Sequence, residues 1–333
     1  MKYIALGLAT AIAGATMLAP AADAQRVRLS VSSWGSPQHP QVSEFVDRFV
    51  KGVEERTKGQ ITFRTFSGGE MVQQQFVATA VPQGTVDISL TTLDTWSGRI
   101  PEVSVTVSPL WPYTMQKARE KFLPGEPIFE YFNDKLKANG AVLLTLFDIG
   151  SPVLSTRAKV VNPKDIAGRT VRTYSKGASE LLQAVGASPV TMGVGDVYSA
   201  LQRGAVDGAL GGIQGAVGLK HFEVTKFVMV PNGLFGTLVH AYVMNKDKWE
   251  SLTPEQQKAV QEAATEARNH SQDFMINSYQ KFVQVFRDNG LEVTVVEPGS
   301  DLWNAWQGTL GDLAAKDRKR YPSELVKLIE NVK

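Results

Sequence analysis

The chain has 333 residues, a formal net charge of +2, no cysteine and a hydrophobic fraction of 43%, which is ordinary for a globular protein. The absence of cysteine excludes disulfides, thiol nucleophiles, cysteine-ligated zinc, iron–sulfur clusters and a lipidated amino-terminal cysteine. Because the charge is small and the basic residues are dispersed, neither nucleic acid nor an anionic membrane surface is indicated as a partner.

Residues 1–24 have the layout of a cleaved secretory signal peptide. Lys2 precedes an apolar run that ends in the small-residue triplet 22–24, so we expect cleavage before Gln25. A membrane anchor is the alternative, but Pro20 and glycines interrupt the run, and no later segment is apolar over the width of a bilayer. We therefore expect no direct membrane insertion. Export without an anchor favours the periplasm, with secretion to the medium as the alternative.

The beginning of the mature chain alternates predicted strands with predicted helices. Strands are expected at residues 27–33, 61–66 and 86–90, and helices with one apolar face at residues 42–53 and 72–81. This order predicts an α/β fold with a parallel sheet and right-handed crossovers.

The same order recurs later in the chain. Residues 170–173, 189–191 and 206–210 are predicted strands, and residues 175–185 and 197–202 are predicted helices. The sequence QGTVD at 83–87 corresponds to RGAVD at 203–207, and the aspartate of each is expected to make a local turn-forming hydrogen bond. Two similar α/β units predict two facing lobes with a ligand cleft between them.

The remaining elements predict how the two lobes are connected. Strands are expected at 141–147, 227–230, 238–245 and 291–296, and the strand at 238–245 could return the chain to the first lobe. A capping box at Thr253 begins a helix that ends at Asn289, which at ~1.5 Å per residue is roughly 50 Å long. It keeps no heptad pattern, so we expect a strut across both lobes and not a coiled coil. Residues 302–332 form a helical tail.

These elements give predicted lobe boundaries. We expect lobe I to contain residues 26–149 and 238–299, and lobe II to contain residues 150–237 and 300–333, with the chain crossings forming a hinge.

Arg172 stands where the predicted strand 170–173 leads into the predicted helix 175–185. Open α/β sheets bind ligands at the carboxyl ends of their strands. A guanidinium holds a carboxylate with two parallel hydrogen bonds, and the amino terminus of the helix adds partial positive charge for the same anion. We interpret Arg172 as a carboxylate clamp; the alternative is a surface arginine in an ion pair.

Motifs for catalysis and for cofactors are absent from the sequence. No segment matches a nucleophile elbow, a zinc-protease helix or a P-loop. Gly193 and Gly195 begin a dinucleotide-type pattern, but Tyr198 occupies its third glycine position. The histidines are scattered along the sequence, so structural roles are favoured over a metal site. We expect no enzymatic activity, no cofactor and no metal.

Several motifs occur together in one order. Residues 163–172 fit P-x-D-I-x-G-x-x-V-R, residues 182–192 fit L-x-x-x-G-A-x-P-V-x-M, residues 197–208 fit V-Y-x-A-L-Q-x-G-x-V-D-G, and residues 249–257 fit W-x-x-L-T-P-E-Q-Q. With the signal peptide, these motifs resemble the periplasmic solute-binding subunit of TRAP (tripartite ATP-independent periplasmic) transporters. The resemblance implies a two-lobed periplasmic-binding-protein fold with a hinge and a long lobe-spanning helix, and a ligand that is usually an organic acid.

The resemblance also implies site residues, and two positions depart from it. Arg172 matches the carboxylate-binding arginine of the family. Gly211 and Gly212 stand where many members that bind sugar acids have an asparagine, and a second arginine is replaced near Gly150. We therefore expect a site with one arginine and an aromatic lining, although each aromatic alone is more often core than ligand contact. The expected lining consists of Trp34, Trp96, Trp111, Phe147 and Tyr174.

The resulting hypothesis is a binding protein that captures a small organic acid and delivers it to the membrane subunits of a TRAP transporter. Receptors that serve a sensor or another class of transporter are alternatives, and a periplasmic enzyme is a further one.

Overall fold

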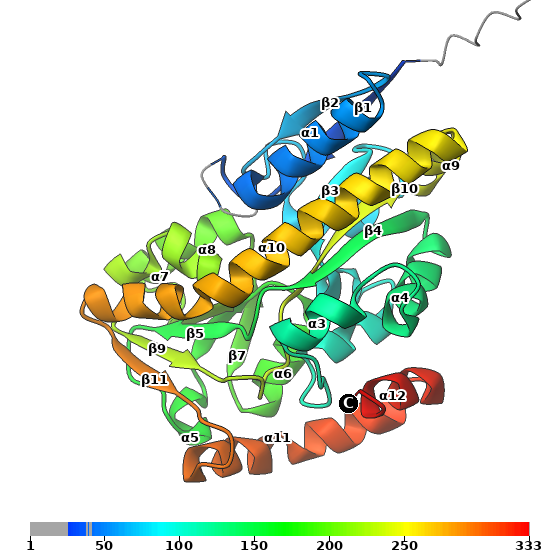
Figure 1. The fold of residues 1–333 in the computed structure, drawn as a ribbon. Helices are drawn as coiled ribbons and strands as arrows, with labels where there is room; N and C mark the ends of the chain where they lie inside the picture. The colour runs from blue at the N-terminus through cyan, green and yellow to red at the C-terminus, as the bar shows by residue number, and fades with distance from the viewer. Residues whose placement is uncertain (1–25, 38, 40–41, 333) are drawn as a thin grey trace, which may run out of the picture.

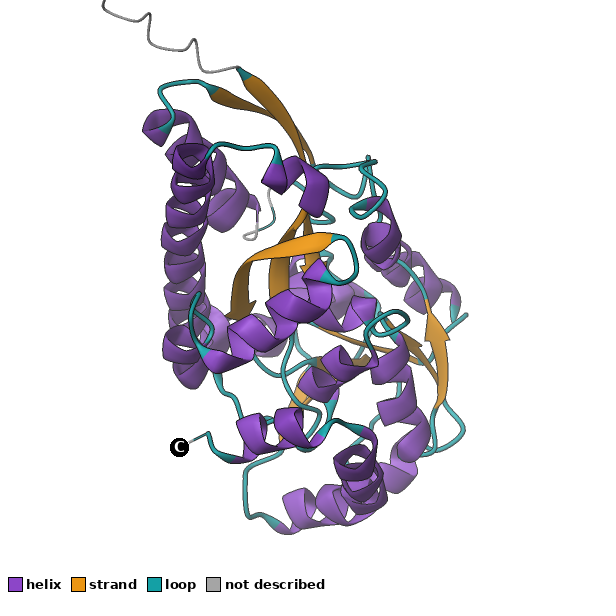
Figure 2. Cartoon of the chain, turned by 90° about the vertical axis from the view of Figure 1, so that its right-hand side faces the viewer, coloured by secondary structure: helices purple, strands orange, loops and turns teal. Residues whose placement is uncertain are grey.

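The structure is a computed structural model that describes residues 26–37, 39 and 42–332. The predicted signal peptide lies outside the described residues. The described chain is an α/β protein with two sheets and helices along their outer sides (Figures 1 and 2). Within this part of the chain, no helix is both long enough and apolar enough to cross a membrane.

The first sheet has five strands in the order β2-β1-β3-β10-β4. β1 pairs in parallel with β2 and β3, whereas β10 is antiparallel to both β3 and β4. The strand predicted to return the chain to the first lobe is thus confirmed as β10. The strands are β1 (Val27–Ser32), β2 (Ile61–Phe66), β3 (Ile88–Thr92), β4 (Ala141–Asp148) and β10 (Val239–Asn245).

The second sheet has six strands in the order β11-β9-β5-β8-β6-β7. β6 pairs in parallel with β7 and β8, and β5 is antiparallel to β8 and β9. The strands are β5 (Val153–Thr156), β6 (Thr170–Thr173), β7 (Ser188–Thr191), β8 (Gly208–Gly211), β9 (Phe227–Val230) and β11 (Glu292–Val295).

Helices fill most of the connections. The α-helices are α1 (Asp47–Arg56), α2 (Val77–Ala80), α3 (Met115–Lys121), α4 (Pro127–Lys137), α5 (Pro163–Ile166), α6 (Lys176–Ala184), α7 (Val197–Arg203), α8 (Ile213–Gly218), α9 (Lys246–Glu250), α10 (Pro254–Asp288), α11 (Asp301–Arg320) and α12 (Ser323–Glu330). Short helical segments of other types lie at Val42–Val46, Gln74–Phe76, Leu93–Trp96, Pro101–Val107, Val194–Asp196 and His221–Glu223.

The two predicted α/β units are confirmed and share a topology. Each places its first strand between the other two, as β2-β1-β3 and as β7-β6-β8. The corresponding aspartates act alike: Asp87 accepts a hydrogen bond from the Ser30 amide on β1 (2.7 Å), and Asp207 accepts one from the Thr170 amide on β6 (2.9 Å). These bonds join neighbouring strands, so the expectation of a local turn was wrong. They tie the third strand of each unit to the first.

Helix α10 spans both lobes as predicted (Figure 1). Thr253 and Gln256 form the expected capping box, and Pro254 is the first helical residue. The helix packs against α1, β4 and α3 of the first lobe and against α8 and β11 of the second.

Two segments differ from the predicted lobe boundaries. β11, expected in lobe I, pairs with β9 in the second sheet, because α10 has by then carried the chain to the far lobe. α12, expected in lobe II, packs on α4 and buries Leu325 and Ile329 in the apolar cluster of the first lobe. The long helix and the tail therefore each link the two sheets.

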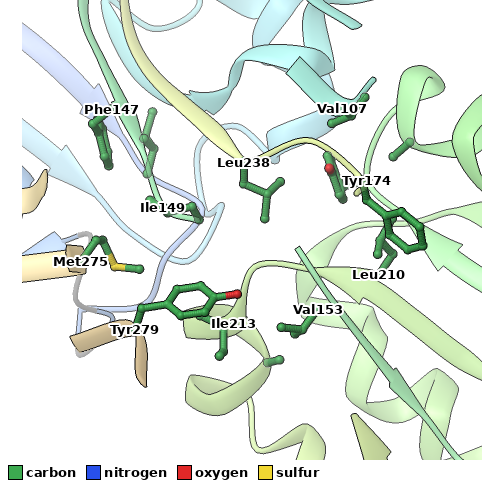
Figure 3. Close-up of a cluster of buried hydrophobic side chains, with 14 of the residues drawn as sticks. Val107, Phe147, Ile149, Val153, Tyr174, Leu210, Ile213, Leu238, Met275 and Tyr279 are labelled. Carbon is green, nitrogen blue, oxygen red and sulfur yellow. The ribbon is translucent and has the colours of Figure 1, made fainter. Parts of the chain in front are cut away.

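The connection from β4 to β5 passes through a tight contact with α10. Gly150 has φ +90°, and a Cβ at this position would lie 2.5 Å from the Cε2 atom of Tyr279. The Tyr279 hydroxyl donates to the carbonyl of Ser151 (3.0 Å). Around this ring, Ile149, Leu238 and their neighbours form an apolar cluster between the lobes (Figure 3). Residue 150 therefore has to be glycine, because its φ is positive and because a side chain would clash with the Tyr279 ring.

We expect Gly150→Ala to lower the free energy of unfolding by about 2–5 kcal/mol, because it combines left-handed backbone strain with a clash against the Tyr279 ring. Gly125→Ala is the matched control: Gly125 has φ +88° but nothing within 4 Å of its Cβ position, so only the strain, about 1 kcal/mol, is expected. Urea unfolding of both variants measures the difference. Equal losses would show that the contact with Tyr279 contributes nothing.

Candidate functional site

Arg172 is buried at the carboxyl end of the second sheet, with 4% of its surface exposed. Its Nε and Nη2 donate to the carbonyl of Met192 (3.1 and 3.0 Å), and its Nη1 donates to the carbonyl of Leu210 (3.1 Å). Both carbonyls belong to the strand ends on either side of β6. The local fold thus fixes the direction in which the guanidinium points.

No carboxylate pairs with Arg172 among the described residues. A guanidinium has five N–H donors, so the three bonds to carbonyls leave one N–H on each of Nη1 and Nη2. Burial lowers the pKa of Arg172 to about 10, which still leaves it charged at neutral pH. The alternative of a surface arginine in an ion pair therefore does not hold. Arg172 is therefore a buried cation with two N–H groups that no carbonyl of the protein accepts from, as an anion-binding group requires.

The cavity beside Arg172 lies between the two sheets. The first lobe contributes the ends of β1 and β3 and the start of β10, and the second lobe contributes the ends of β6 and β8 and the helix α8. The cavity has a volume of about 40 Å³. Its lining includes Trp34, Gln74, Thr92, Ile149, Arg172, Tyr174, Gly211, Gly212, Gln214, His221, Leu238 and His240.

Five of the expected site residues meet at this cavity: Arg172, Trp34, Tyr174, Gly211 and Gly212. Tyr174 follows β6 and packs near Leu210 (Figure 3). A Cβ at Gly211 would lie 3.3 Å from Nη1 of Arg172, so a side chain there would crowd the guanidinium. The absence of a side chain at this strand end therefore keeps space beside the cation.

Three of the expected aromatic residues do not line the cavity. Trp96 and Trp111 belong to the apolar cluster of the first lobe, where the indole of Trp111 donates to the Thr237 hydroxyl (2.9 Å). The ring of Phe147 stacks on the ring of Phe45 and lies well apart from Tyr174 (Figure 3). Large rings are stabilised by burial, and here core packing accounts for their positions.

The helix end next to Arg172 also differs from the expectation. Asp94, from the first lobe, reaches the amino terminus of α6 and accepts a hydrogen bond from the Ser175 hydroxyl, the helix cap. A Cβ at Gly177 would lie 2.5 Å from Oδ1 of Asp94, which shows how closely the carboxylate approaches the helix. The partial charge of this helix end thus serves a contact between lobes. Apart from histidines, Arg172 is the one basic side chain among the described residues that line the cavity.

No pattern in the sequence indicated the polar residues that line the cavity. Gln74, Gln214 and His221 lie in short helical segments without a recognisable motif. Burial lowers the pKa of His221 to about 4 and that of His240 to about 3, so both imidazoles are neutral at pH 7. Within the described residues, no cluster of three or more acidic or histidine side chains could hold a metal ion.

Comparison with known proteins agrees with the fold. Residues 31–313 match the family described as bacterial extracellular solute-binding protein, family 7. The 2,3-diketo-L-gulonate-binding periplasmic protein YiaO of Escherichia coli is 26% identical over 336 residues, which cover 100% of each chain.

Two solved structures share the fold. DctP7 of Bordetella pertussis, an extracytoplasmic solute receptor binding pyroglutamic acid, has a TM-score of 0.83 at 17% identity, covering 92% of this chain and 100% of its own. A TRAP periplasmic solute-binding protein from Sulfitobacter with bound β-D-galacturonate has a TM-score of 0.81 at 22% identity, covering 91% and 99%.

The family match spans most of the chain, and the fold is that of the solved relatives. The chain belongs to family 7 of the bacterial extracellular solute-binding proteins, the solute receptors of TRAP transporters.

Proposed function

We propose that this protein is a periplasmic receptor that captures a small organic acid by its carboxylate and delivers it to the membrane subunits of a TRAP transporter. The observation that carries the proposal is the buried charge of Arg172, which faces the cavity between the lobes without an anionic partner among the described residues. An uncompensated buried charge is costly, and a bound carboxylate would supply the missing partner.

The named ligands of relatives support this chemistry. 2,3-Diketo-L-gulonate, pyroglutamic acid and β-D-galacturonate are each the ligand of one relative, and each compound carries a carboxylate. The two remaining N–H groups of Arg172 suit a charge-assisted, bidentate bond to such a group.

Closure of the lobes is the proposed capture step. The cavity takes its lining from both lobes, so its full set of contacts exists only when they meet. A ligand that binds across both lobes shifts the population toward the closed form by its differential affinity. The bond between Asp94 and Ser175 joins the lobes next to the site and belongs to the same closed form.

We expect Arg172→Ala to weaken binding by about a hundredfold to several thousandfold, since a carboxylate left desolvated without its cation costs about 3–5 kcal/mol. Arg172→Lys keeps the charge but not the two parallel N–H donors of the guanidinium, so its affinity should lie between those of the wild type and Arg172→Ala. Calorimetric titration with an acid selected by thermal shift from a screen of small carboxylates measures both variants.

Arg268 provides the matched control. It is also buried and also bonds backbone carbonyls, those of Leu146 and Arg119, but it does not line the cavity. Arg268→Ala should lower stability and leave affinity in the folded protein within about threefold of wild type. Binding by Arg172→Ala within about threefold of wild type would contradict the carboxylate clamp.

The contact at Asp94 predicts a pH dependence. Burial raises the pKa of Asp94 from 3.8 to about 7, partly offset by the hydrogen bond from Ser175, and burial raises that of Asp148 to about 7 as well. At these two carboxyls the folded protein keeps protons that the unfolded chain releases, so each contributes a fall in the free energy of unfolding as pH rises from about 4 to about 7. The buried His39, His221 and His240, whose pKa values are lowered, contribute a rise over much of the same range.

Asp94→Asn and Asp148→Asn should each remove the contribution of one carboxyl, so that the free energy of unfolding rises more with pH than in the wild type, and most in the double variant. Urea unfolding at a series of pH values measures the slopes. A wild-type slope retained in both single variants would show that neither carboxyl is its source.

The proposed location predicts release of the mature protein by disruption of the outer membrane alone. Intact-mass measurement of the released protein should show a chain that begins at Gln25, because the residue pattern before it fits a signal-peptide cleavage site. A mass that retains Lys2, or fractionation with the inner membrane, would contradict the predicted export and cleavage.

A further inference from the structure

Asp94 lies at the contact between the lobes and is fully buried. It belongs to the short helical segment Leu93–Trp96, which follows β3 of the first lobe. Its Oδ2 accepts a hydrogen bond from the hydroxyl of Ser175, the cap of α6 in the second lobe, and its Oδ1 would lie 2.5 Å from a Cβ at Gly177. Part of the enclosure of this carboxyl is therefore supplied by the opposite lobe.

The groups around Asp94 offer it no positive charge. The hydroxyl of Ser104, in the segment Pro101–Val107, faces it from the first lobe. The other ionisable side chains that affect it, or that it affects, are Glu180 on α6, Tyr174 before α6 and Tyr321 after α11. Arg320 pairs with Glu180 and Asp317, and no cation of the described residues forms an ion pair with Asp94. An ionised Asp94 would be a buried charge without a counter-ion, which is costly.

The enclosure therefore favours the neutral acid form of this side chain. Burial raises the pKa of Asp94 from 3.8 to about 7. Separation of the lobes would take α6 away and admit water, which returns the pKa toward 3.8. At pH 6 the enclosed carboxyl is protonated in about nine-tenths of the molecules, and a hydrated one in about one-hundredth or less.

We propose that capture of the organic acid is coupled to the uptake of a proton, which Asp94 binds as the lobes close and releases as they open. The proton comes from the solvent or its buffer and converts the carboxylate of Asp94 to a carboxylic acid. The inference rests on the proposed function, because it takes closure of the lobes as the capture step. It adds that the receptor holds its acid more tightly at low pH than at high pH.

Calorimetric titration in two buffers of different ionisation enthalpy, phosphate and ACES, measures the protons taken up for each molecule of acid bound. The probe is the acid selected by thermal shift from the screen of small carboxylates. The wild type should take up more protons than Asp94→Asn, by about 0.9 at pH 6 and about 0.5 at pH 7. Any proton that the buried His221 and His240 release on closure is common to both proteins, so the difference isolates Asp94.

The affinity should follow the same linkage. From pH 6 to pH 8 the affinity of the wild type should fall about tenfold relative to that of Asp94→Asn, because closure must bring in a proton that becomes scarcer. Ser175→Ala tests the proposal without substituting the carboxyl. It removes a hydrogen bond that favours the charged form, so the pKa of Asp94 should rise further and proton uptake at pH 8 should exceed that of the wild type.

Asp148→Asn is the matched control. Burial raises the pKa of Asp148 to about 7 as well, but its carboxyl accepts from the amide of Gly150 (2.6 Å), two residues further along the chain, and not from α6. This variant should keep the proton uptake of the wild type.

The outcomes separate this inference from the function on which it rests. Equal proton uptake by the wild type and Asp94→Asn, or an uptake that is lost in Asp148→Asn and kept in Asp94→Asn, would overturn the inference and leave the carboxylate receptor standing. Uptake by Ser175→Ala at pH 8 no greater than that of the wild type would also overturn it. Failure of every acid in the screen to bind would overturn the receptor and this inference with it.

Discussion

A positive charge buried between the two lobes is the constraint on which the site depends. Arg172 is held by the carbonyls of Met192 and Leu210, which fix its direction but do not neutralise it. Carbonyl dipoles replace part of the water that the guanidinium loses, whereas only an anion balances its charge. The proposed carboxylate would supply the missing negative charge, which is why we propose that binding and closure are coupled.

Arg268 shows why burial alone does not identify a site. Burial lowers its pKa to about 10, as it does for Arg172, and its nitrogens also bond backbone carbonyls. Arg268 holds α10 against β4 and α3 and does not line the cavity between the lobes, so its contacts are those of a structural residue. What distinguishes Arg172 is the space in front of it and the convergence of both lobes on that space.

Two tightly packed contacts join the two lobes. The β4–β5 connection passes the Tyr279 ring with room for a glycine only, and Asp94 is buried against the cap of α6. Both contacts lie next to the cavity, so the same packing that closes the site also fixes the geometry of its walls. Within each lobe, the repeated bonds of Asp87 and Asp207 tie the starts of β3 and β8 to the neighbouring strands β1 and β6.

Local patterns were sufficient for the sequence to determine the strand and helix order of the two α/β units, the capped long helix and the position of Arg172, because alternation, helical spacing and caps act over a few residues. Tertiary structure decided the rest. Asp87 and Asp207 bond a neighbouring strand, and β11 joins the sheet that α10 delivers it to. The aromatic residues divided between core and cavity, and the polar lining came from segments with no periodic pattern. Such contacts join residues far apart in the chain, and only packing of the two lobes brings them together.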